Sequence, residues 1–448
     1  MEQCRSCTNV AQGEPRAASA EWLIRSSPDL AISHCTPMLK LDLVHTVALA
    51  GVMLFLGYGI RRAVPPLGRY NIPAPVIGGL LVTVASALAR SAGIALLDVD
   101  TTLQVPLMTA FFTSIGFGAS TALLRAGGPQ VLLFFLIASV IAVVQNIVGI
   151  ALTIPFDLHP LFGVLSGSVT LTGGPATGLA FAPEFERVGI PGAASVAVAA
   201  AMAGIIAGGL IGGPVGTRII QRHRLGRAQQ KAAGDVGAPT AAEIVELRAD
   251  EPASDPPPDE SAGAYRLLKS IVAILVAMWV GSWVSDGLGA LGLTLPGYIG
   301  AMLIAAAIRN IDDRTHIIGL SQRTIDDLGS AALSLFLVLA LMTLELWQLA
   351  GLALPLLVIV SVQVLIVAAL AVWPVFALMG HDYDAAVMAG GFCGFMLGTT
   401  ANAMANMTAL VERYGAAPRA FLVVPMVGAF FIDFTNAIII IVFLNVIR

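Results

Sequence analysis

The sequence predicts an all-α polytopic membrane protein that consists of two inverted repeats of five transmembrane helices, each with a re-entrant hairpin. The first observation behind this prediction is composition, because 57% of the 448 residues are hydrophobic and only 12% are charged, whereas a soluble domain has about 25% charged residues. The second is that apolar residues form long runs with few charges, and about 18 such residues suffice to cross a bilayer. The third is that features of the first half recur in the second half.

Composition also limits the class of protein and its partners. The apolar runs are continuous rather than alternating, which excludes a transmembrane β-barrel. A formal net charge of −4 at pH 7 is too small to indicate a nucleic-acid partner. The lipid bilayer is therefore the partner that composition itself predicts.

Residues 1–37 precede the first apolar run and are expected to form a disordered extension. They are mixed in polarity, and no apolar stretch of the kind found in signal peptides follows their arginines. Met38 stands directly before the first run, so a second interpretation is that translation starts there. Mass spectrometry of the native protein separates the two, because abundant peptides from residues 1–37 would exclude the later start.

The first repeat is expected to occupy residues 38–220. Long apolar runs predict its five spans, at about 43–60, 76–89, 106–124, 131–154 and 193–220. The fifth run contains Gly208-Gly209 and Gly212-Gly213, and small residues four positions apart let helices approach each other closely. A further apolar segment at about 161–182 is interrupted by glycine and hydroxyl residues, and it is the predicted first hairpin.

Residues 221–264 form the one long polar stretch within the apolar part of the chain. The stretch begins with several arginines and continues into an acidic, proline-rich sequence. Charged and proline-rich chains cannot bury enough apolar surface to fold, so these residues are predicted to be a disordered linker between the repeats.

The second repeat is expected to occupy residues 265–448 and to follow the plan of the first. Its predicted spans lie at about 267–284, 296–308, 328–346, 352–378 and 419–446, with a second hairpin at about 385–410. Pro75 and Gly79 recur as Pro296 and Gly300, 221 positions later. Because each half has an odd number of spans, the second repeat enters the membrane from the opposite side and is inverted.

Orientation follows from lysine and arginine, which are enriched in cytoplasmic loops. Arg61, Arg125, Arg309 and Arg413 mark four of the loops that should be cytoplasmic, and basic residues at the start of the linker mark another. With five spans in each half, all of these basic loops lie on the cytoplasmic side of the membrane. The prediction therefore places the N- and C-termini outside and the central linker in the cytoplasm.

The two interrupted segments are the main functional signal. The first contains Gly167-Ser-Val-Thr-Leu-Thr-Gly-Gly-Pro-Ala-Thr-Gly178, and the second contains Gly390-Gly-Phe-Cys-Gly-Phe-Met-Leu-Gly-Thr-Thr-Ala-Asn-Ala-Met-Ala-Asn406. A helical arm of roughly ten residues is about 15 Å long, half the hydrocarbon core, so each tip should lie near the midplane. Interrupted segments in corresponding positions of two halves indicate a transporter's binding site.

Exposed N–H groups at such tips can hold a carboxylate, because the N-terminus of a helix carries a partial positive charge. The candidate substrate-binding residues are Thr172, Gly173, Gly174, Thr177, Gly398, Thr399, Thr400, Asn402 and Asp433. Free carbonyl, hydroxyl and carboxylate oxygens suit a hard cation such as Na⁺. The candidate sodium ligands are Ser168, Thr170, Asn406, Asp433 and Asn436. Close helix packing is the alternative role for these small residues.

Asp433 is the most informative single residue, because it lies near the middle of the last predicted span. A carboxylate there costs about 2.5–3.5 kcal/mol on insertion scales and therefore indicates function. It could coordinate Na⁺, pair with a substrate ammonium group or relay a proton, and a structural hydrogen bond is the alternative. Gln145, Asn146 and Gln363 are intramembrane amides for which helix contact and binding both stay open.

The chain resembles the bacterial sodium/glutamate symporter family over residues 38–448 without the linker. The resemblance rests on the first interrupted segment, on short motifs at 72–79, 123–128, 211–214 and 405–407, and above all on Ala420-Phe-Leu-Val-Val-Pro-Met-Val-Gly-Ala-Phe-Phe-Ile-Asp433. It implies Na⁺-coupled uptake of L-glutamate by alternating access of the elevator type, with Na⁺ as coupling ion and no organic cofactor. It also implies a homodimer in the bacterial inner membrane.

Other functions are weighed against this one. The chain departs from the family's usual residues at Pro175-Ala176, Met396 and Thr400–Asn402, so a sodium- or proton-coupled carrier of another carboxylate or amino acid is the alternative. Tyr383-Asp384 resembles half of an intramembrane aspartyl protease pair, but the sequence contains no partner Gly-x-Gly-Asp. The chain is therefore not expected to be an enzyme, and no short pore unit that would suit a tetrameric channel is present.

Overall fold

The computed structural model describes residues 39–92, 97–121, 128–225, 262–290, 296–349 and 351–447. The expected N-terminal extension, residues 1–37, lies outside the described residues, and so does most of the expected linker. At its two ends the linker is shorter than predicted, because helix continues to His223 before it and begins again at Ala262 after it.

The described residues are helical almost throughout, which confirms the all-α membrane class. Seven of the described helical stretches are long and apolar enough to cross a bilayer. They are built on α1 (Leu43–Ala63), α3 (Ala74–Ser91), α6 (Gly128–Thr153), α9 (Ala193–His223), α11 (Ala262–Ala290), α13 (Gln322–Met342) and α14 (Ala353–Leu370).

Within the described residues, the other three of the ten expected spans do not form a single helix that is long and apolar enough to cross a bilayer. Helix α4 (Gln104–Gly118) has 15 residues and ends six residues before the predicted position. Helix α12 (Tyr298–Thr315) continues past the predicted end at residue 308 through a strongly charged final turn. The last span is divided into α18 (Pro418–Met426), the π-helical segment η6 (Val427–Phe431) and α19 (Ile432–Val446). Five spans per half therefore stays a prediction.

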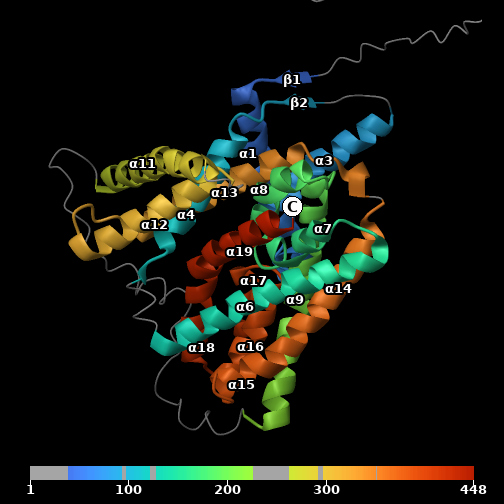
Figure 1. Cartoon of the computed structure of the whole chain (residues 1–448), viewed down its shortest axis with the longest axis vertical. Helices are drawn as coiled ribbons and strands as arrows, with labels where there is room; N and C mark the ends of the chain where they lie inside the picture. Colours follow the sequence, from blue (N-terminus) through green and yellow to red (C-terminus); the bar gives the residue numbers. More distant parts are fainter. Residues whose placement is uncertain are drawn as a thin grey trace, which may run out of the picture. The chain divides into compact units, whose positions relative to one another are not determined.

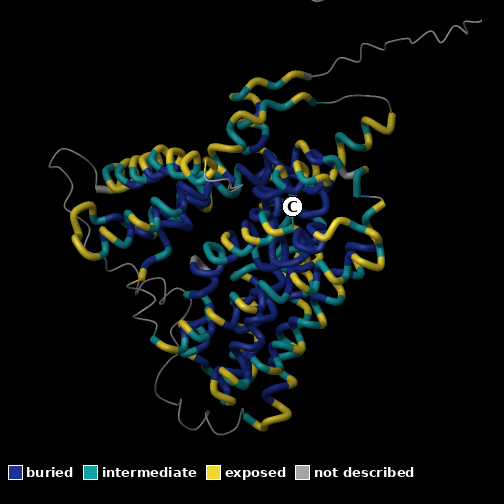
Figure 2. The backbone as a smooth tube through the Cα atoms, viewed as in Figure 1, coloured by how far each residue is buried: buried dark blue, intermediate teal, exposed yellow. Residues whose placement is uncertain are grey.

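The helices pack into two groups. The first helix group consists of α1, α3, α4, α11, α12 and α13, so each half of the chain supplies three helices. The second helix group contains the remaining long helices and both interrupted segments. In Figure 1, α4, α11 and α12 lie side by side at the left, while α14 lies beside both α6 and α9 in the centre and right of the view. Figure 2 shows that buried residues run along most helices of the second group.

The first helix group uses the same contact in both halves. Helix α1 packs on α3, and α11 packs on α12. A Cβ atom added to Gly57 would lie 2.2 Å from the carbonyl oxygen of Ala74, and one added to Gly281 would lie 2.3 Å from the Cα atom of Ala301. Both pairs of helices therefore touch backbone to backbone.

Helix α9 packs closely against the second interrupted segment. Its glycines at positions 204, 208, 212 and 216 form one column against α16 (Tyr383–Met396), α17 (Thr400–Tyr414) and the break between them. A Cβ atom on Gly204 would lie 2.4 Å from the Leu397 carbonyl oxygen, and one on Gly212 would lie 2.6 Å from that of Gly390. The predicted close contact is confirmed for the first glycine of each doublet. It is wrong for the second, because Gly209 and Gly213 face open space.

A short pair of strands was not predicted. Strands β1 (Leu39–Leu41) and β2 (Leu97–Val99) are parallel, with Leu39 opposite Leu97 (Figure 1). Each strand has three residues, too few for an alternating pattern to be recognised. The pair joins the segment before α1 to the segment that follows α3.

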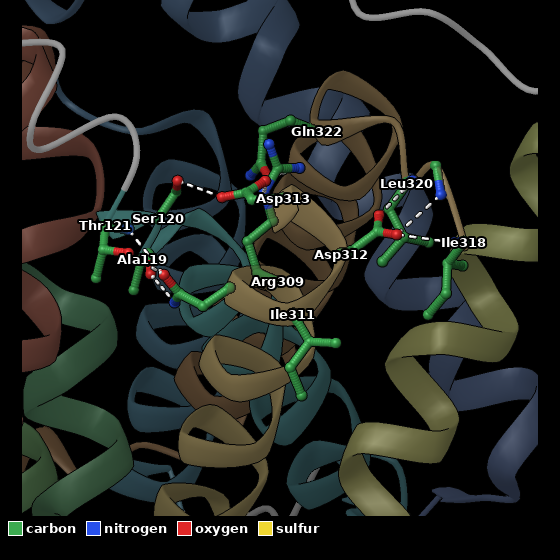
Figure 3. A network of polar contacts seen from close by, with 12 residues as sticks. Ala119, Ser120, Thr121, Arg309, Ile311, Asp312, Asp313, Ile318, Leu320 and Gln322 are labelled. Carbon is green, nitrogen blue, oxygen red and sulfur yellow. Dashed lines mark hydrogen bonds and ion pairs between the residues drawn. The ribbon is translucent and has the colours of Figure 1, made fainter. Parts of the chain in front are cut away.

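A polar network fixes the ends of α4, α12 and α13 (Figure 3). The Nε atom of Arg309 lies 2.7 Å from a carboxylate oxygen of Asp313, and both side chains are largely buried. Asn310 accepts from the Thr121 amide at 2.9 Å and donates to the Ala119 carbonyl at 2.8 Å. Polar side chains at the end of the apolar part of α12 thus hold the residues that follow α4 in place.

The same network contains a carboxylate held by three backbone amides. Asp312 accepts from the N–H groups of residues 318, 319 and 320 at 2.8–3.0 Å. It lies beyond the apolar part of α12. Burial raises the pKa of this carboxyl group, but the three N–H donors and nearby Arg309 outweigh it, so the pKa is lowered from the ordinary value.

Candidate functional site

The first interrupted segment consists of two helical arms with a break between them. The first arm is α7 (Pro160–Val164) followed by the π-helical segment η3 (Leu165–Val169), and the second arm is α8 (Gly174–Arg187). Gly167 has non-helical dihedral angles, with φ −100° and ψ −128°. Gly174 has φ +69°, a conformation that favours glycine. Both glycines thus break the helix, as the sequence predicts.

The second interrupted segment has the same form. Helix α16 ends at Met396, and α17 begins at Thr400 after a break of three residues. Thr399 caps α17, because its hydroxyl accepts from the backbone N–H of Asn402 at 3.3 Å. A threonine cap satisfies one of the donors that every helix N-terminus leaves free.

The two breaks lie against each other. A Cβ atom on Gly174 would lie 3.4 Å from the carbonyl oxygen of Gly398 and 4.0 Å from the Cγ2 atom of Thr399. Gly174 is the first residue of α8, and Thr399 is the cap of α17. The N-termini of two helices from the two halves of the chain therefore meet, and each brings a partial positive charge and free N–H groups.

A side chain of α6 connects the two breaks. The Thr172 hydroxyl donates to Oε1 of Gln145 at 2.6 Å, and Nε2 of Gln145 donates to the Met396 carbonyl at 2.9 Å. Gln363 donates to the backbone carbonyl of Gln145 at 2.6 Å. From the sequence, these amides could serve either helix contact or binding. The structure places Gln145 between the two interrupted segments.

The break at Gly167 is also held by amides. The backbone N–H of Ser168 donates to Oδ1 of Asn146, and Nδ2 of Asn436 on α19 donates to the Ser168 carbonyl, both at 2.9 Å. Ser168 and Asn436, two of the candidate sodium ligands, are thus in direct contact. Both residues are fully buried.

Several oxygens around this break have no hydrogen-bond partner within the described part of the chain. They are the hydroxyl oxygens of Ser166 and Ser168 and the side-chain carbonyl oxygens of Gln363 and Asn436. A buried polar atom without a partner costs about 1–3 kcal/mol, so it requires an explanation. Oxygen atoms are the ligands that hard cations prefer, and this set fits Na⁺.

Other predicted site residues have structural hydrogen bonds. The Thr170 hydroxyl donates to the Leu165 carbonyl of its own arm, and the Thr400 hydroxyl donates to the Gly428 carbonyl of η6, both at 2.8 Å. Nδ2 of Asn402 donates to the Ile205 carbonyl at 2.8 Å, and Nδ2 of Asn406 donates to the Gly208 carbonyl at 2.9 Å. These two amides hold α17 against α9, a role that the sequence alone did not separate from binding.

The remaining candidates lie at the ends of helices around the breaks. Thr177 is buried in the first turn of α8, and Gly173 caps that helix. Asp433 is half-buried in the first turn of α19, three residues before Asn436 and so on the same side of the helix. It makes no hydrogen bond or ion pair to the residues that the structure describes.

Comparison with known proteins identifies the family. The model of the sodium/glutamate symporter family matches residues 39–416. The sodium/glutamate symporter of Haemophilus influenzae is 38% identical over 393 residues, which cover 88% of this chain and 94% of that protein. The sodium/glutamate symporter of Escherichia coli is 40% identical over 404 residues, which cover 90% and 97%.

The chain belongs to the sodium/glutamate symporter family.

Membership of this symporter family confirms the resemblance found in the sequence and the prediction that the chain is not an enzyme, because its relatives are named as transporters. The residues matched by the family model include both interrupted segments and Gln145, and they end two residues before α18. Asp433 and Asn436 therefore lie beyond that match.

Proposed function

We propose that this member of the sodium/glutamate symporter family imports L-glutamate together with Na⁺ across the bacterial inner membrane. The observation that carries the proposal is the meeting of the two breaks, where the N-termini of α8 and α17 come together. The names of the relatives supply the substrate and the ion. The sequence pattern supplies the membrane orientation, with the termini outside.

Glutamate would bind where the helix N-termini meet. Its carboxylates suit the N–H groups that the N-termini of α8 and α17 leave free, because a helix N-terminus carries a partial positive charge. Gly173, Gly174 and Gly398 have no side chain, so the backbone can approach the substrate closely. Asp433 would balance the ammonium group of the substrate or the charge of Na⁺.

Sodium would bind at the break around Gly167. Ser168 and Asn436 supply buried oxygens without partners, and Asp433 supplies a negative charge one turn from Asn436. Thr170 and Asn406 donate hydrogen bonds elsewhere, so the proposal relies less on them. Because Asn436 contacts the Ser168 carbonyl, Na⁺ bound there would fix the first interrupted segment to α19.

Alternating access would follow from movement of the second helix group relative to the first. The second group carries both interrupted segments, while the first group takes three helices from each half and repeats the same packing in both. This division supports an elevator movement of inverted repeats with re-entrant hairpins. The first group would then provide the contact between the two subunits of a homodimer.

Transport by purified protein in proteoliposomes tests the proposal. Radiolabelled L-glutamate should accumulate when an inward Na⁺ gradient is imposed and should not accumulate when K⁺ replaces Na⁺. Uptake that is unaffected by removal of Na⁺ would overturn sodium coupling. Accumulation driven by a proton gradient, or stronger competition by another carboxylate than by glutamate, would favour the alternative carrier.

A further inference from the structure

A groove lies between α9 and α17, at the ends of these helices that are distant from the breaks. It is open to the surface, has a volume of about 1150 Å³ and is lined by residues of α9 and α17 together with Ala368 of α14. The bonds from Asn402 and Asn406 to α9 hold its two sides together. The groove is therefore built from helices of the second group alone.

The wall of the groove is apolar over most of its length. Leu210 is 50% exposed there, and Pro214 and Ala409 are also exposed. A Cβ atom on Gly213 would meet no other atom within 4 Å, so no other described residue covers the groove wall at this point. In a chain whose helices cross a bilayer, such an uncovered apolar groove suits an acyl chain.

The end of the groove is positively charged. Arg218, Arg222 and Arg413 line it, and none of the lining residues is acidic. Arg218 and Arg222 are one turn apart on α9, so they share a face, and all three arginines are exposed. Within the described residues none of the three forms an ion pair with a carboxylate.

The two helices are also joined at this end. Nε2 of Gln221 donates to the Tyr414 hydroxyl at 3.3 Å, and the Arg413 guanidinium lies 5.2 Å from the centre of the Tyr414 ring. Three guanidinium groups around one opening fit a phosphate, which arginine binds through paired hydrogen bonds. Basic pockets between helices at the cytoplasmic side bind anionic lipid headgroups.

We propose that this groove binds one anionic phospholipid, with its phosphate on the three arginines and an acyl chain against Leu210, Gly213 and Pro214. An apolar wall next to clustered arginines matches a molecule that is both apolar and anionic. A free carboxylate would leave that wall uncovered. The proposal needs only the bilayer and does not rest on glutamate transport.

Native mass spectrometry of the detergent-purified chain tests the proposal. The protein is titrated with phosphatidylglycerol, with phosphatidylcholine of the same acyl chains, and with glycerol 3-phosphate, which carries the phosphate without acyl chains. We expect one phosphatidylglycerol to bind at least tenfold more tightly than either other compound. Equal affinity for phosphatidylcholine, or equal affinity for glycerol 3-phosphate, would overturn the phospholipid assignment.

Variants locate the site. The triple substitution R218Q/R222Q/R413Q should lower phosphatidylglycerol affinity at least tenfold, whereas R61Q/R62Q, in the last turn of α1, should leave it unchanged. Ala409→Trp fills the apolar part and should also weaken binding while all three arginines remain. Unchanged affinity in both the triple variant and Ala409→Trp would place the lipid elsewhere. Gel filtration of each variant confirms that it is folded before titration.

Discussion

Gln145 donates its side-chain amide to the carbonyl oxygen of Met396 at 2.9 Å, so a helix of the first half supports the break in the second half. The same side chain accepts from the Thr172 hydroxyl at the other break. One fully buried residue thus links the two interrupted segments.

Replacing Gln145 with leucine should therefore disturb both breaks at once. The Thr172 hydroxyl and the Met396 carbonyl would each lose a buried partner, which costs about 1–3 kcal/mol per group. We expect a lower melting temperature in detergent and at least tenfold weaker glutamate binding by calorimetry. Gln104→Leu, on α4, is the control. Wild-type affinity in the Gln145 variant would show that the breaks hold their position without this bridge.

Asp433→Asn should abolish Na⁺-driven uptake while the protein still inserts into the membrane. The substitution keeps the shape of the side chain and removes its negative charge, which the proposed site needs for Na⁺ or for the substrate ammonium group. Uptake in proteoliposomes measures the effect, and Asp286→Asn on the exposed side of α11 is the matched control. Normal sodium-dependent transport by the Asp433 variant would remove this residue from the mechanism.

Ser168→Ala should raise the Na⁺ concentration that gives half-maximal uptake. Loss of one ligand oxygen that is worth about 1.4 kcal/mol corresponds to a tenfold change. Ser139→Ala on α6 removes a hydroxyl that bonds only to the Phe135 carbonyl within the described residues, so it should have no such effect. The same sodium dependence in both variants would contradict the assignment of Ser168.

A bulky residue at Gly174, such as valine, should prevent substrate binding. Gly174 has φ +69°, where a branched side chain is strained, and its Cβ atom would point toward the Gly398 carbonyl. Calorimetric titration with glutamate should detect no binding, whereas Gly51→Val, on α1 with open space around it, should bind normally. Unchanged affinity in the Gly174 variant would move the site away from the breaks.

Because of Asp312, the stability of the folded protein should depend on pH in the acidic range. Its pKa is lowered in the folded protein, so its stabilising effect is complete well above the ordinary value of 3.8. The effect is lost as the pH falls below about 3.8 toward the lowered pKa, because the folded state then takes up the proton that the unfolded state already holds. Asp312→Asn should flatten this part of the curve of melting temperature against pH. Asp286→Asn should reproduce the wild-type curve.

Sequence patterns located the breaks because glycine and threonine within an apolar run are local signals. Gly167 and Gly174 interrupt the first segment, and Thr399 caps α17, as residues of these types do elsewhere. The roles of amides could not be predicted in this way. Gln145 contacts a residue 251 positions away, and Asn406 contacts one 198 positions away, so the partner exists only after the helices have packed.

Element ends were less predictable than element positions. Polar residues after position 308 suggested the end of a span, but α12 continues to Thr315 because Arg309 and Asp313 pair within the helix. The strand pair β1–β2 joins segments that are distant in sequence and carries no local pattern. Both errors come from interactions that composition does not record.

The glycine column of α9 has a mechanical consequence. Where two helices meet through side chains, rotamer changes can absorb a small shift, but a Cβ atom on Gly204 of α9 would lie only 2.4 Å from the Leu397 carbonyl oxygen, so backbone meets backbone there. Helix α9 also packs against α8 of the first segment. Because α9 contacts both interrupted segments, we expect a displacement of one break to be transmitted through α9 to the other with little change in the distance between them.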